Sequence, residues 1–340
     1  MNKINRQLIL QQRPSGRPTA DIFSFRETPL EDPKDGEFLL KIHYISMDPA
    51  LVSRLRPEQN YAAGIQPGDL MHAFCVAEVI ESGCAQASTG QFRIGLFGMQ
   101  EYVIADLASG GAVITIDGVS PSWYLGVLGN SGGTAYFALK EICQPRAGET
   151  LVISSAASSV GSIASQLAAA TDCRIVGIVS TDDKARATLD RFPYDAVISY
   201  RNKSVQELAE ELAAVCPEGV DCYFDNTSGD ISEALLDLYN IGARIAVVGR
   251  MGLSHLQDTR QDIGRRDNNI ILSRRIKKQG FLYGDYLHRL EEFQRALSAM
   301  LHSGELKADE DIIEGFNHLP EAFMRMVNGE SRGKQLVKLS

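Results

Sequence analysis

A run of small residues at positions 151–162 has the composition and spacing needed to bind an anion. It begins as a buried apolar strand, continues as a tight turn of Ser and Ala, and ends as the start of a helix. In such a unit the backbone N–H groups and the helix N-terminus face a phosphate. Ser155, Ser158 and Gly161 keep the three-residue spacing of the dinucleotide-binding fingerprint, with serine in place of two glycines. The run predicts a pyrophosphate site, although an ordinary strand-to-helix turn would also be rich in small residues.

The next strand carries the residues that select between two cofactors. It covers 174–179, so that strand, turn, helix and strand fall within about thirty residues, as a βαβ unit requires. At its end an NAD-binding protein has an acid that accepts a hydrogen bond from the ribose 2′-hydroxyl. This chain has Ser180 instead. Asp182 and Asp183 follow at the start of a helix, where their charge suits the helix N-terminus.

Cations and hydrogen-bond donors accompany the missing acid. Lys184, Tyr200 and Arg201 fall in the sector where NADP carries its 2′-phosphate. A single lysine at this place would by itself suit a solvated surface. In combination with the missing acid, these residues favour NADP(H) over NAD(H). Whether Ser155 and Ser158 bond to the pyrophosphate stays open.

Composition excludes several other classes of protein. A chain of 340 residues with 44% hydrophobic content can bury a large core and is expected to form two domains. The net charge of −9 leaves no broad basic surface for nucleic acid or anionic lipid. The six cysteines form no metal-binding pattern, which predicts reduced, mostly buried thiols and no metal. With no secretory signal and no membrane-spanning segment in the sequence, we expect a cytoplasmic protein with a small-molecule substrate.

The elements that must position these residues form two regions with different sequence patterns. Residues 1–122 and 304–340 hold short strands broken by Gly, Pro and Asp, which is typical of a compact barrel-like β-domain. Residues 123–303 hold strands alternating with helices, the pattern of a doubly wound parallel sheet. The last segment, 334–339, reads as a strand that rejoins the β-domain. In the second region we expect helices at 121–141, 160–171 and 285–303 and strands at 150–154, 174–179, 196–198, 221–225, 243–249 and 279–283.

Seven short motifs occur along the chain in a fixed order. They are Ser-Met-Asp-Pro at 46–49, the glycine-containing run at 129–137, the run 144–150, Tyr-Phe-Asp-Asn at 223–226, Gln-Gly-Phe at 279–281, Ile-Glu-Gly-Phe at 313–316 and Gly-Lys at 333–334. Each is weak alone, but their order and spacing are specific. Over nearly its whole length the chain resembles the zinc-independent medium-chain reductases, and within them the prostaglandin reductases and bacterial curcumin reductase-like enzymes.

This resemblance implies a GroES-like β-barrel domain and a Rossmann domain, with NADP(H) held in the cleft between them. It also implies hydride transfer from NADPH to the β-carbon of an α,β-unsaturated ketone or aldehyde, without a metal. The carbon must be held over the nicotinamide, and the developing enolate must be stabilised. Because the proton can come from solvent, no catalytic acid is assigned. Relatives form dimers through the Rossmann sheet edge, for which 241–248 and 270–272 are candidates here.

The resemblance also gives a set of candidate cofactor residues. Lys184 and Tyr200 correspond to the family's ligands for the 2′-phosphate. For the rings of Tyr223, Phe224 and Phe281, plain core packing is an alternative. The full candidate set is Asn130, Thr134, Ala157, Ser158, Ser159, Val160, Gly161, Ser180, Lys184, Tyr200, Asn226, Gly249, Met251, Phe281, Leu282, Tyr283 and Ser331.

The substrate region departs from the family pattern. Residues 50–52 are Ala-Leu-Val where the family has Tyr-Met-Arg, and 73–75 replace a glycine-rich strand entry with bulkier residues. Ser254 replaces a loop tyrosine, and Ser331 replaces an asparagine. An arginine-rich segment at 260–266 would meet an anionic substrate or form a solvated loop. Specificity for prostaglandin or curcumin is therefore not carried over.

Four residues are candidates for the substrate pocket: Tyr44, Arg54, Tyr283 and Tyr286. Tyr44 is a candidate enolate donor or, alternatively, an interior strand tyrosine bonded to backbone. Two other functions remain open. One is quinone reduction by NADPH, which the added Phe74 would suit. The other is an NADP-binding sensor or interaction protein with an altered pocket.

Overall fold

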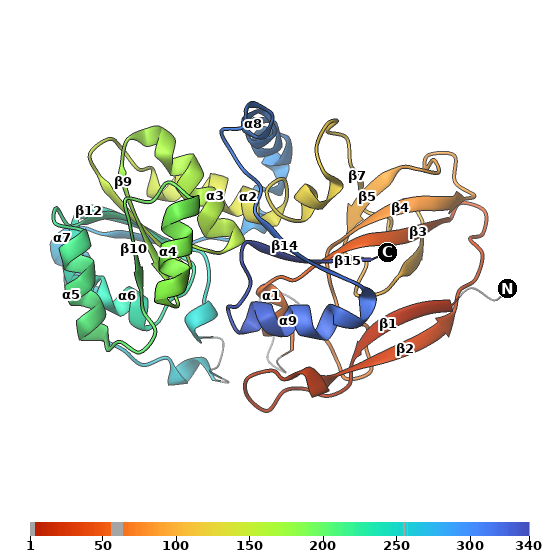
Figure 1. Ribbon diagram of the computed structural model, residues 1–340, viewed down its shortest axis with the longest axis horizontal. Helices are drawn as coiled ribbons and strands as arrows, with labels where there is room; N and C mark the ends of the chain where they lie inside the picture. The colour runs from red at the N-terminus through yellow and green to blue at the C-terminus, as the bar shows by residue number, and fades with distance from the viewer. Residues whose placement is uncertain (1–3, 56–63, 254–255, 257, 340) are drawn as a thin grey trace. The chain divides into compact units, whose positions relative to one another are not determined.

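The computed structural model divides into two units, each with its own structure. The described residues are 4–55, 64–253, 256 and 258–339. Unit 1 comprises Met1–Gly126 and Glu310–Ser340, and unit 2 comprises Val127–Asp309 (Figure 1). No helix among the described residues is long and apolar enough to cross a membrane.

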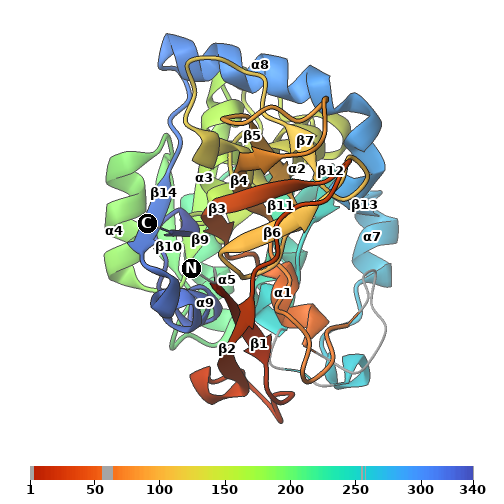
Figure 2. The ribbon, with the colours of Figure 1, turned by 90° about the vertical axis from the view of Figure 1, so that its right-hand side faces the viewer.

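Unit 1 is mainly β-structure. Its strands are β1 (Ile4–Leu10), β2 (Phe23–Pro29), β3 (Phe38–Ser46), β4 (Cys75–Ser82), β5 (Phe92–Gly95), β6 (Tyr102–Ala105), β7 (Ala112–Val113), β14 (Glu310–Glu314) and β15 (Lys334–Lys338). Its helical segments are η1 (Ala20–Ile22), α1 (Ala50–Arg54), η2 (Pro121–Leu125), η9 (Phe316–His318) and α9 (Leu319–Val327). One sheet has the order β14-β15-β3-β4-β5-β7 with β6 also on β3, and β1 and β2 form a hairpin (Figure 2).

The C-terminal strand closes unit 1. In β15, Leu336 lies opposite Ser46 of β3 in an antiparallel pair. The prediction that the last strand rejoins the β-domain is therefore confirmed. The core of this unit includes Phe323 of α9, whose ring meets Phe23 edge-on at 5.2 Å between centroids.

Unit 2 is built on one parallel sheet. Its strands are β8 (Thr150–Ser154), β9 (Arg174–Val179), β10 (Ala196–Ser199), β11 (Val220–Asp225), β12 (Tyr239–Val247) and β13 (Lys277–Gly280). Its helical segments are α2 (Asn130–Phe137), η3 (Ala138–Cys143), α3 (Ser159–Ala168), η4 (Ala169–Thr171), α4 (Asp182–Arg191), α5 (Val205–Val215), α6 (Asp230–Ala234), η5 (Leu236–Leu238), η6 (Met251–Leu253), η7 (Thr259–Gln261), α7 (Asn268–Arg274), η8 (Tyr283–Arg289) and α8 (Leu290–Ser303). The strand order β10-β9-β8-β11-β12-β13 is that of a Rossmann fold, which confirms the predicted fold class.

Burial explains why β8 reads as an unbroken apolar run. Leu151, Val152 and Ile153 are fully buried, as expected for a central parallel strand that is covered on both faces. On one face, Val152 belongs to a core that includes Leu212 of α5 and Ile270 of α7 (Figure 1).

Two predicted elements differ from the structure. The helix expected at 121–141 is a 3-10 turn, then α2, then the π-helical stretch η3, because Gly126 and Gly129 interrupt the first part. The strand expected at 279–283 ends at Gly280, and a 3-10 helix with Gly284 in its first turn follows.

The predicted dimer edge also needs correction. Residues 241–248 fall in β12 and just beyond it, and β12 is paired on both sides, with β11 and with β13. The strand at this edge of the sheet is β13. The sequence pattern favoured 241–248 because it is the more apolar strand, and an interior strand is the more buried one.

Candidate cofactor site

The turn between β8 and α3 is closed by its own backbone. Ser155 lies at φ 54°, in the left-handed region that ordinarily favours glycine. Ala156 N–H donates to the carbonyl of Ile178 in β9 (3.0 Å), and Ser158 N–H donates to the carbonyl of Ser155 (2.9 Å). These bonds fix the turn where α3 begins.

Ser158 caps α3. Its hydroxyl oxygen accepts a hydrogen bond from Gly161 N–H (3.1 Å), so its own proton stays available to a ligand. The N–H groups of Ser159 and Val160 belong to the first turn, which has no intrahelical acceptors. Together with Ala157, these predicted residues form one N–H-rich helix start.

Gly161 allows the helix to approach the turn. A Cβ at this position would lie 2.5 Å from the carbonyl oxygen of Ser155 and 2.9 Å from that of Ala156. Since both atoms are backbone, only glycine fits. Gly161 thus does what the last glycine of the fingerprint does, namely permit close packing of helix and strand.

The ends of β9 and β10 bring together the residues predicted for the 2′-phosphate. Tyr200 N–H donates to the last carbonyl of β9 (3.0 Å), and Arg201 N–H donates to the carbonyl of Ser180 (3.3 Å). Thr181 caps α4, and its hydroxyl oxygen accepts from Lys184 N–H (3.3 Å). Lys184 therefore lies in the first turn of α4, directly after the end of β9.

Both aspartates at the start of α4 have partners of their own. Asp182 accepts a hydrogen bond from the hydroxyl of Ser199, and Asp183 pairs with Arg186. They lie in the first helical turn, as predicted, where a carboxylate is stabilised by the helix dipole.

The next three strand ends carry further predicted residues. Asn226 follows β11 and is held to Ser154, its N–H donating to the hydroxyl oxygen (2.8 Å) and its Nδ2 to the carbonyl (2.7 Å). Gly249 N–H donates to the carbonyl of Asp225 (3.0 Å), and Phe281 N–H donates to the last carbonyl of β12 (3.0 Å). All these residues share the carboxyl edge of the sheet, where doubly wound proteins bind their ligands.

A buried carboxylate that sequence reasoning did not single out supports this edge. Asp225 is 2% exposed, and its Oδ1 accepts from the N–H groups of Thr227 (3.1 Å) and Ser228 (2.7 Å). The Tyr223 hydroxyl also donates to Oδ1 (3.0 Å), and the Ser232 hydroxyl donates to Oδ2 (2.7 Å). These bonds fix the loop after β11. Asp225 belongs to the Tyr-Phe-Asp-Asn motif at 223–226, but that motif does not by itself indicate the role of the acid.

Tyr283 packs on the helix that carries Asn130 and Thr134. A Cβ at Gly133 of α2 would lie 2.2 Å from the Tyr283 ring, so only glycine fits beneath it. Burial raises the pKa of Tyr283 to about 12, and its hydroxyl therefore keeps its proton at neutral pH. The Thr134 hydroxyl reaches Oδ1 of Asn130 one helical turn earlier (3.4 Å). Leu282, next to Tyr283, is 46% exposed.

The other candidate tyrosine of unit 2 is enclosed by aromatic rings. Tyr286 stacks on Phe137 (4.8 Å between centroids) and on Phe281 (5.2 Å). Stacking on these rings orients the half-buried Tyr286 side chain. Phe281 is buried, in agreement with the core-packing alternative for its ring. Met251 lies in the short helix η6 beyond β12.

The remaining candidates lie in unit 1. Tyr44 is half-buried on β3, opposite Val76. Arg54 ends α1, and its Nη1 lies 3.0 Å from Nδ1 of His72. Burial and the Arg54 charge lower the pKa of His72, so its neutral ring accepts this hydrogen bond. Ser331 lies in the segment just before β15.

The altered loops of unit 2 are only partly described. Ser254, with its neighbour His255, lies outside the described residues. In the segment 260–266, Arg260 pairs with Asp258 (2.7 Å between Nη2 and Oδ2) and Arg265 pairs with Asp237.

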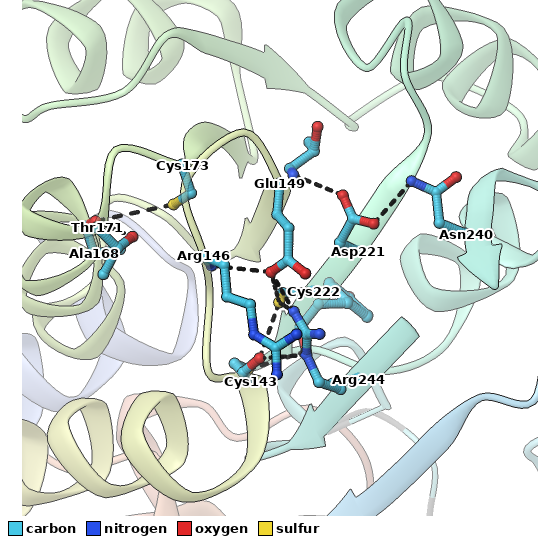
Figure 3. A network of polar contacts seen from close by, with 12 residues as sticks. Cys143, Arg146, Glu149, Ala168, Thr171, Cys173, Asp221, Cys222, Asn240 and Arg244 are labelled. Atoms are coloured by element: carbon cyan, nitrogen blue, oxygen red, sulfur yellow. Dashed lines mark hydrogen bonds and ion pairs between the residues drawn. The ribbon is translucent and has the colours of Figure 1, made fainter. Parts of the chain in front are cut away.

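A second polar network ties the opposite end of the sheet (Figure 3). Glu149 precedes β8 and pairs with Arg244 of β12, whose Nε donates to the Cys143 carbonyl (2.7 Å). Asp221 of β11 accepts from the N–H of Thr150 (2.9 Å). This network lies at the amino ends of β8 and β11, away from the candidate site.

The cysteines are unpaired. Five of the six are buried, and Cys84 is half-buried. Burial raises the pKa of Cys222, a member of the network of Figure 3, to about 12. Across the described part of the chain, no cluster of three or more His, Cys, Asp or Glu side chains could hold a metal ion.

Fold and site define a two-unit protein with a Rossmann sheet of the dinucleotide-binding type. Two family models match the chain, "N-terminal domain of oxidoreductase" over residues 6–113 and "Zinc-binding dehydrogenase" over residues 159–302. The putative NADP-dependent oxidoreductase YfmJ of Bacillus subtilis is 36% identical over 342 residues, covering 100% of this chain and 99% of that protein. The NADPH-dependent curcumin reductase of Escherichia coli is 32% identical, covering 99% and 97%.

A solved structure agrees with these relatives. CurA from Vibrio vulnificus in complex with NADPH superimposes with a TM-score of 0.91 at 32% identity, covering 98% of this chain and 99% of that one. The chain belongs to the medium-chain dehydrogenase/reductase family and is an NADP(H)-dependent oxidoreductase of that family.

Proposed function

We propose that this protein uses NADPH to reduce the carbon–carbon double bond of α,β-unsaturated ketones or aldehydes. The observation that carries the proposal is the carboxyl edge of the unit 2 sheet. It combines an N–H-rich helix start with Lys184 and Tyr200, and it has no acid directly after β9. The names of relatives support the reaction: curcumin reductase of Escherichia coli, 2-alkenal reductase of Nicotiana tabacum and prostaglandin reductase 1 of Sus scrofa.

The described residues fit NADP(H). We assign the pyrophosphate to the turn and the α3 start, because these N–H groups have no helical acceptors. Ser180, Lys184 and Tyr200 would hold the 2′-phosphate. When bound, NADPH supplies the hydride. The nicotinamide half is assigned to the residues at the other strand ends and on α2, namely Asn130, Thr134, Asn226, Gly249, Met251, Phe281, Leu282 and Tyr283. Ser331, in unit 1, stays a predicted cofactor residue.

Unit 1 offers a face suited to an apolar substrate with one polar group. His72 and Phe74 alternate with the buried residues Met71, Ala73 and Cys75. In an extended chain this alternation places the two side chains on the same, outer side of unit 1. Phe74 directly precedes Cys75 and Leu96 directly follows Gly95, the last pair of β4 and β5, and the two side chains are 45% and 49% exposed. We propose that these residues contact the apolar part of the substrate. Arg54, oriented by His72, donates to its oxygen, and Tyr44 of the same unit is a further candidate contact. In unit 2, Tyr283 and Tyr286 stay predicted substrate residues.

The proposal also covers the roles of the two units, the oligomeric state and the location. Unit 1 would act as the catalytic domain and unit 2 as the NADP-binding domain. A homodimer would form through β13, an edge strand flanked by the exposed Leu272 (78%) and Leu282 (46%). A cytoplasmic location is supported by six unpaired cysteines, which are typical of a reducing compartment.

The test is an assay of purified protein with NADPH and a panel of enones, enals and quinones. We expect loss of NADPH absorbance with enones and enals, and a saturated carbonyl compound as product. Faster turnover of quinones would replace this function by quinone reduction. Binding of NADPH without turnover of any compound would leave the cofactor assignment intact and support the sensor alternative.

A further inference from the structure

Tyr194 lies beneath the proposed pyrophosphate turn, in the segment between α4 and β10. The side chain is 6% exposed. Its hydroxyl lies 3.1 Å from the carbonyl oxygen of Ala156 and 2.9 Å from that of Gly161. One carbonyl belongs to the turn and the other to the first part of α3. A single side chain thus joins the two parts of the anion site.

The ring has a dedicated space. It lies against Gly177 of β9, where a Cβ would be 3.1 Å from two of its ring carbons and 2.8 Å from the Cβ of Ala156. Burial raises the pKa of Tyr194, so the hydroxyl is protonated and can donate. The hydroxyl has one proton, which the carbonyl oxygens of Ala156 and Gly161 share as acceptors. Both carbonyls therefore point toward the Tyr194 hydroxyl.

The geometry of the peptide bond carries this contact to the ligand side. In a trans peptide the C=O and the following N–H point in opposite directions. Fixing the Ala156 carbonyl toward Tyr194 therefore directs Ala157 N–H away from Tyr194. Among the described residues this N–H has no hydrogen-bond acceptor. The turn also contains Ser155 in a left-handed conformation, which costs about 1 kcal/mol and needs support from its surroundings.

We propose that Tyr194 is a positioning residue for the cofactor pyrophosphate, acting through Ala157 N–H and the start of α3. The inference rests on the proposed assignment of this turn to the pyrophosphate. Tyr194 itself contacts no substrate, and it lies outside the fingerprint of Ser155, Ser158 and Gly161.

The test compares Tyr194→Phe with Tyr124→Phe. Tyr124 is an equally buried tyrosine of unit 1, whose hydroxyl accepts from the N–H of Ile116 (2.9 Å). Two dissociation constants are measured for each variant, that of NADPH by fluorescence titration and that of adenosine 2′-phosphate by competition. Adenosine 2′-phosphate lacks the pyrophosphate and reports the Lys184 side of the site alone.

We expect Tyr194→Phe to raise the Kd of NADPH about three- to tenfold, as for loss of one hydrogen bond. The Kd of adenosine 2′-phosphate should stay within about twofold, as should kcat at saturating NADPH. Equal weakening of both ligands would show a general structural role and overturn the inference, as would an unchanged Kd of NADPH. Failure of the wild type to bind NADPH would instead overturn the proposed site.

Discussion

Lys184 and Tyr200 follow the neighbouring strands β9 and β10, in the sector where an NAD-dependent protein would place a carboxylate for the ribose. Their positions follow from local structure. Lys184 belongs to the first turn after the Thr181 cap, and Tyr200 is tied by its N–H to the end of β9. The nearest acid, Asp182, is occupied by Ser199. The proposed assignment attributes selectivity for NADP(H) to these few side chains.

Replacing Lys184 tests this selectivity. Lys184→Gln should raise the Kd of NADPH about tenfold or more, because a charge-assisted bond to phosphate contributes roughly 1.5–3 kcal/mol. The Kd of NADH should change less than about twofold, since NADH has no 2′-phosphate. The control is Lys278→Gln, which removes a lysine of β13 that pairs with Asp267. An equal loss for both cofactors would contradict the assignment.

The two ends of the parallel sheet of unit 2 carry different groups of residues. The carboxyl ends carry the candidate site, and the amino ends carry the network of Glu149 and Arg244 (Figure 3). The two side chains of this pair are 20% and 13% exposed. Its loss should therefore affect the folding of unit 2 and leave the cofactor site intact.

The variant Arg244→Met tests whether the stability of unit 2 can be lowered without a change in NADPH binding. We expect a loss of about 2 kcal/mol in the free energy of unfolding, because Glu149 is left partly buried without its cation. The Kd of NADPH should remain within about twofold. Arg265→Met, which breaks an exposed ion pair with Asp237, should change stability by no more than about 0.5 kcal/mol. A large rise in the NADPH Kd of Arg244→Met would show that the two ends are coupled.

A surface cluster joins α8 to η3 and α2. Hydrogen bonds from Arg289 and Lys140 lower the pKa of Glu292 to about 2. A carboxylate with a lowered pKa contributes stability above its unfolded value of 4.5, and this contribution is lost as the pH falls toward 2.

The variant Glu292→Gln should therefore have a lower Tm than the wild type at neutral pH. The difference should shrink as the pH falls from about 5 toward about 2, where the wild-type carboxyl also becomes neutral. Thermal melts of both proteins across this range measure it. A difference that is independent of pH would mean that packing, and not charge, is responsible.

For the whole molecule, the sequence predicted more of the sheet than of the contacts between elements. Apolar runs such as β8 and β9 are local patterns, and the order of strands and helices follows from them. The Tyr194 contact joins two residues that are 38 positions apart along the chain, so no local pattern contains it. The partners of Asp225 are close in sequence, but they meet only in the folded loop after β11, which the strand pattern does not describe. The edge position of β13 was missed for the same reason, because pairing is decided by tertiary structure and the strand itself is polar.

The proposed homodimer can be tested at that edge. We expect a dimer in analytical ultracentrifugation, and Leu272→Asp should shift it toward monomer because a charge would be buried in the interface. Ile4→Asp, an equally simple change at an exposed residue of unit 1, should leave the dimer intact. A wild-type monomer at all concentrations, or dissociation by both variants, would contradict the proposed interface.

Transfer of the hydride to the β-carbon of an enone is the step that distinguishes the proposed reaction from carbonyl reduction. The most direct measurement is NMR of the product after turnover with NADPH that carries deuterium at the transferred position of C4. We predict one deuterium at the β-carbon and a retained carbonyl group. Deuterium on a carbinol carbon would show carbonyl reduction and would contradict the proposed function.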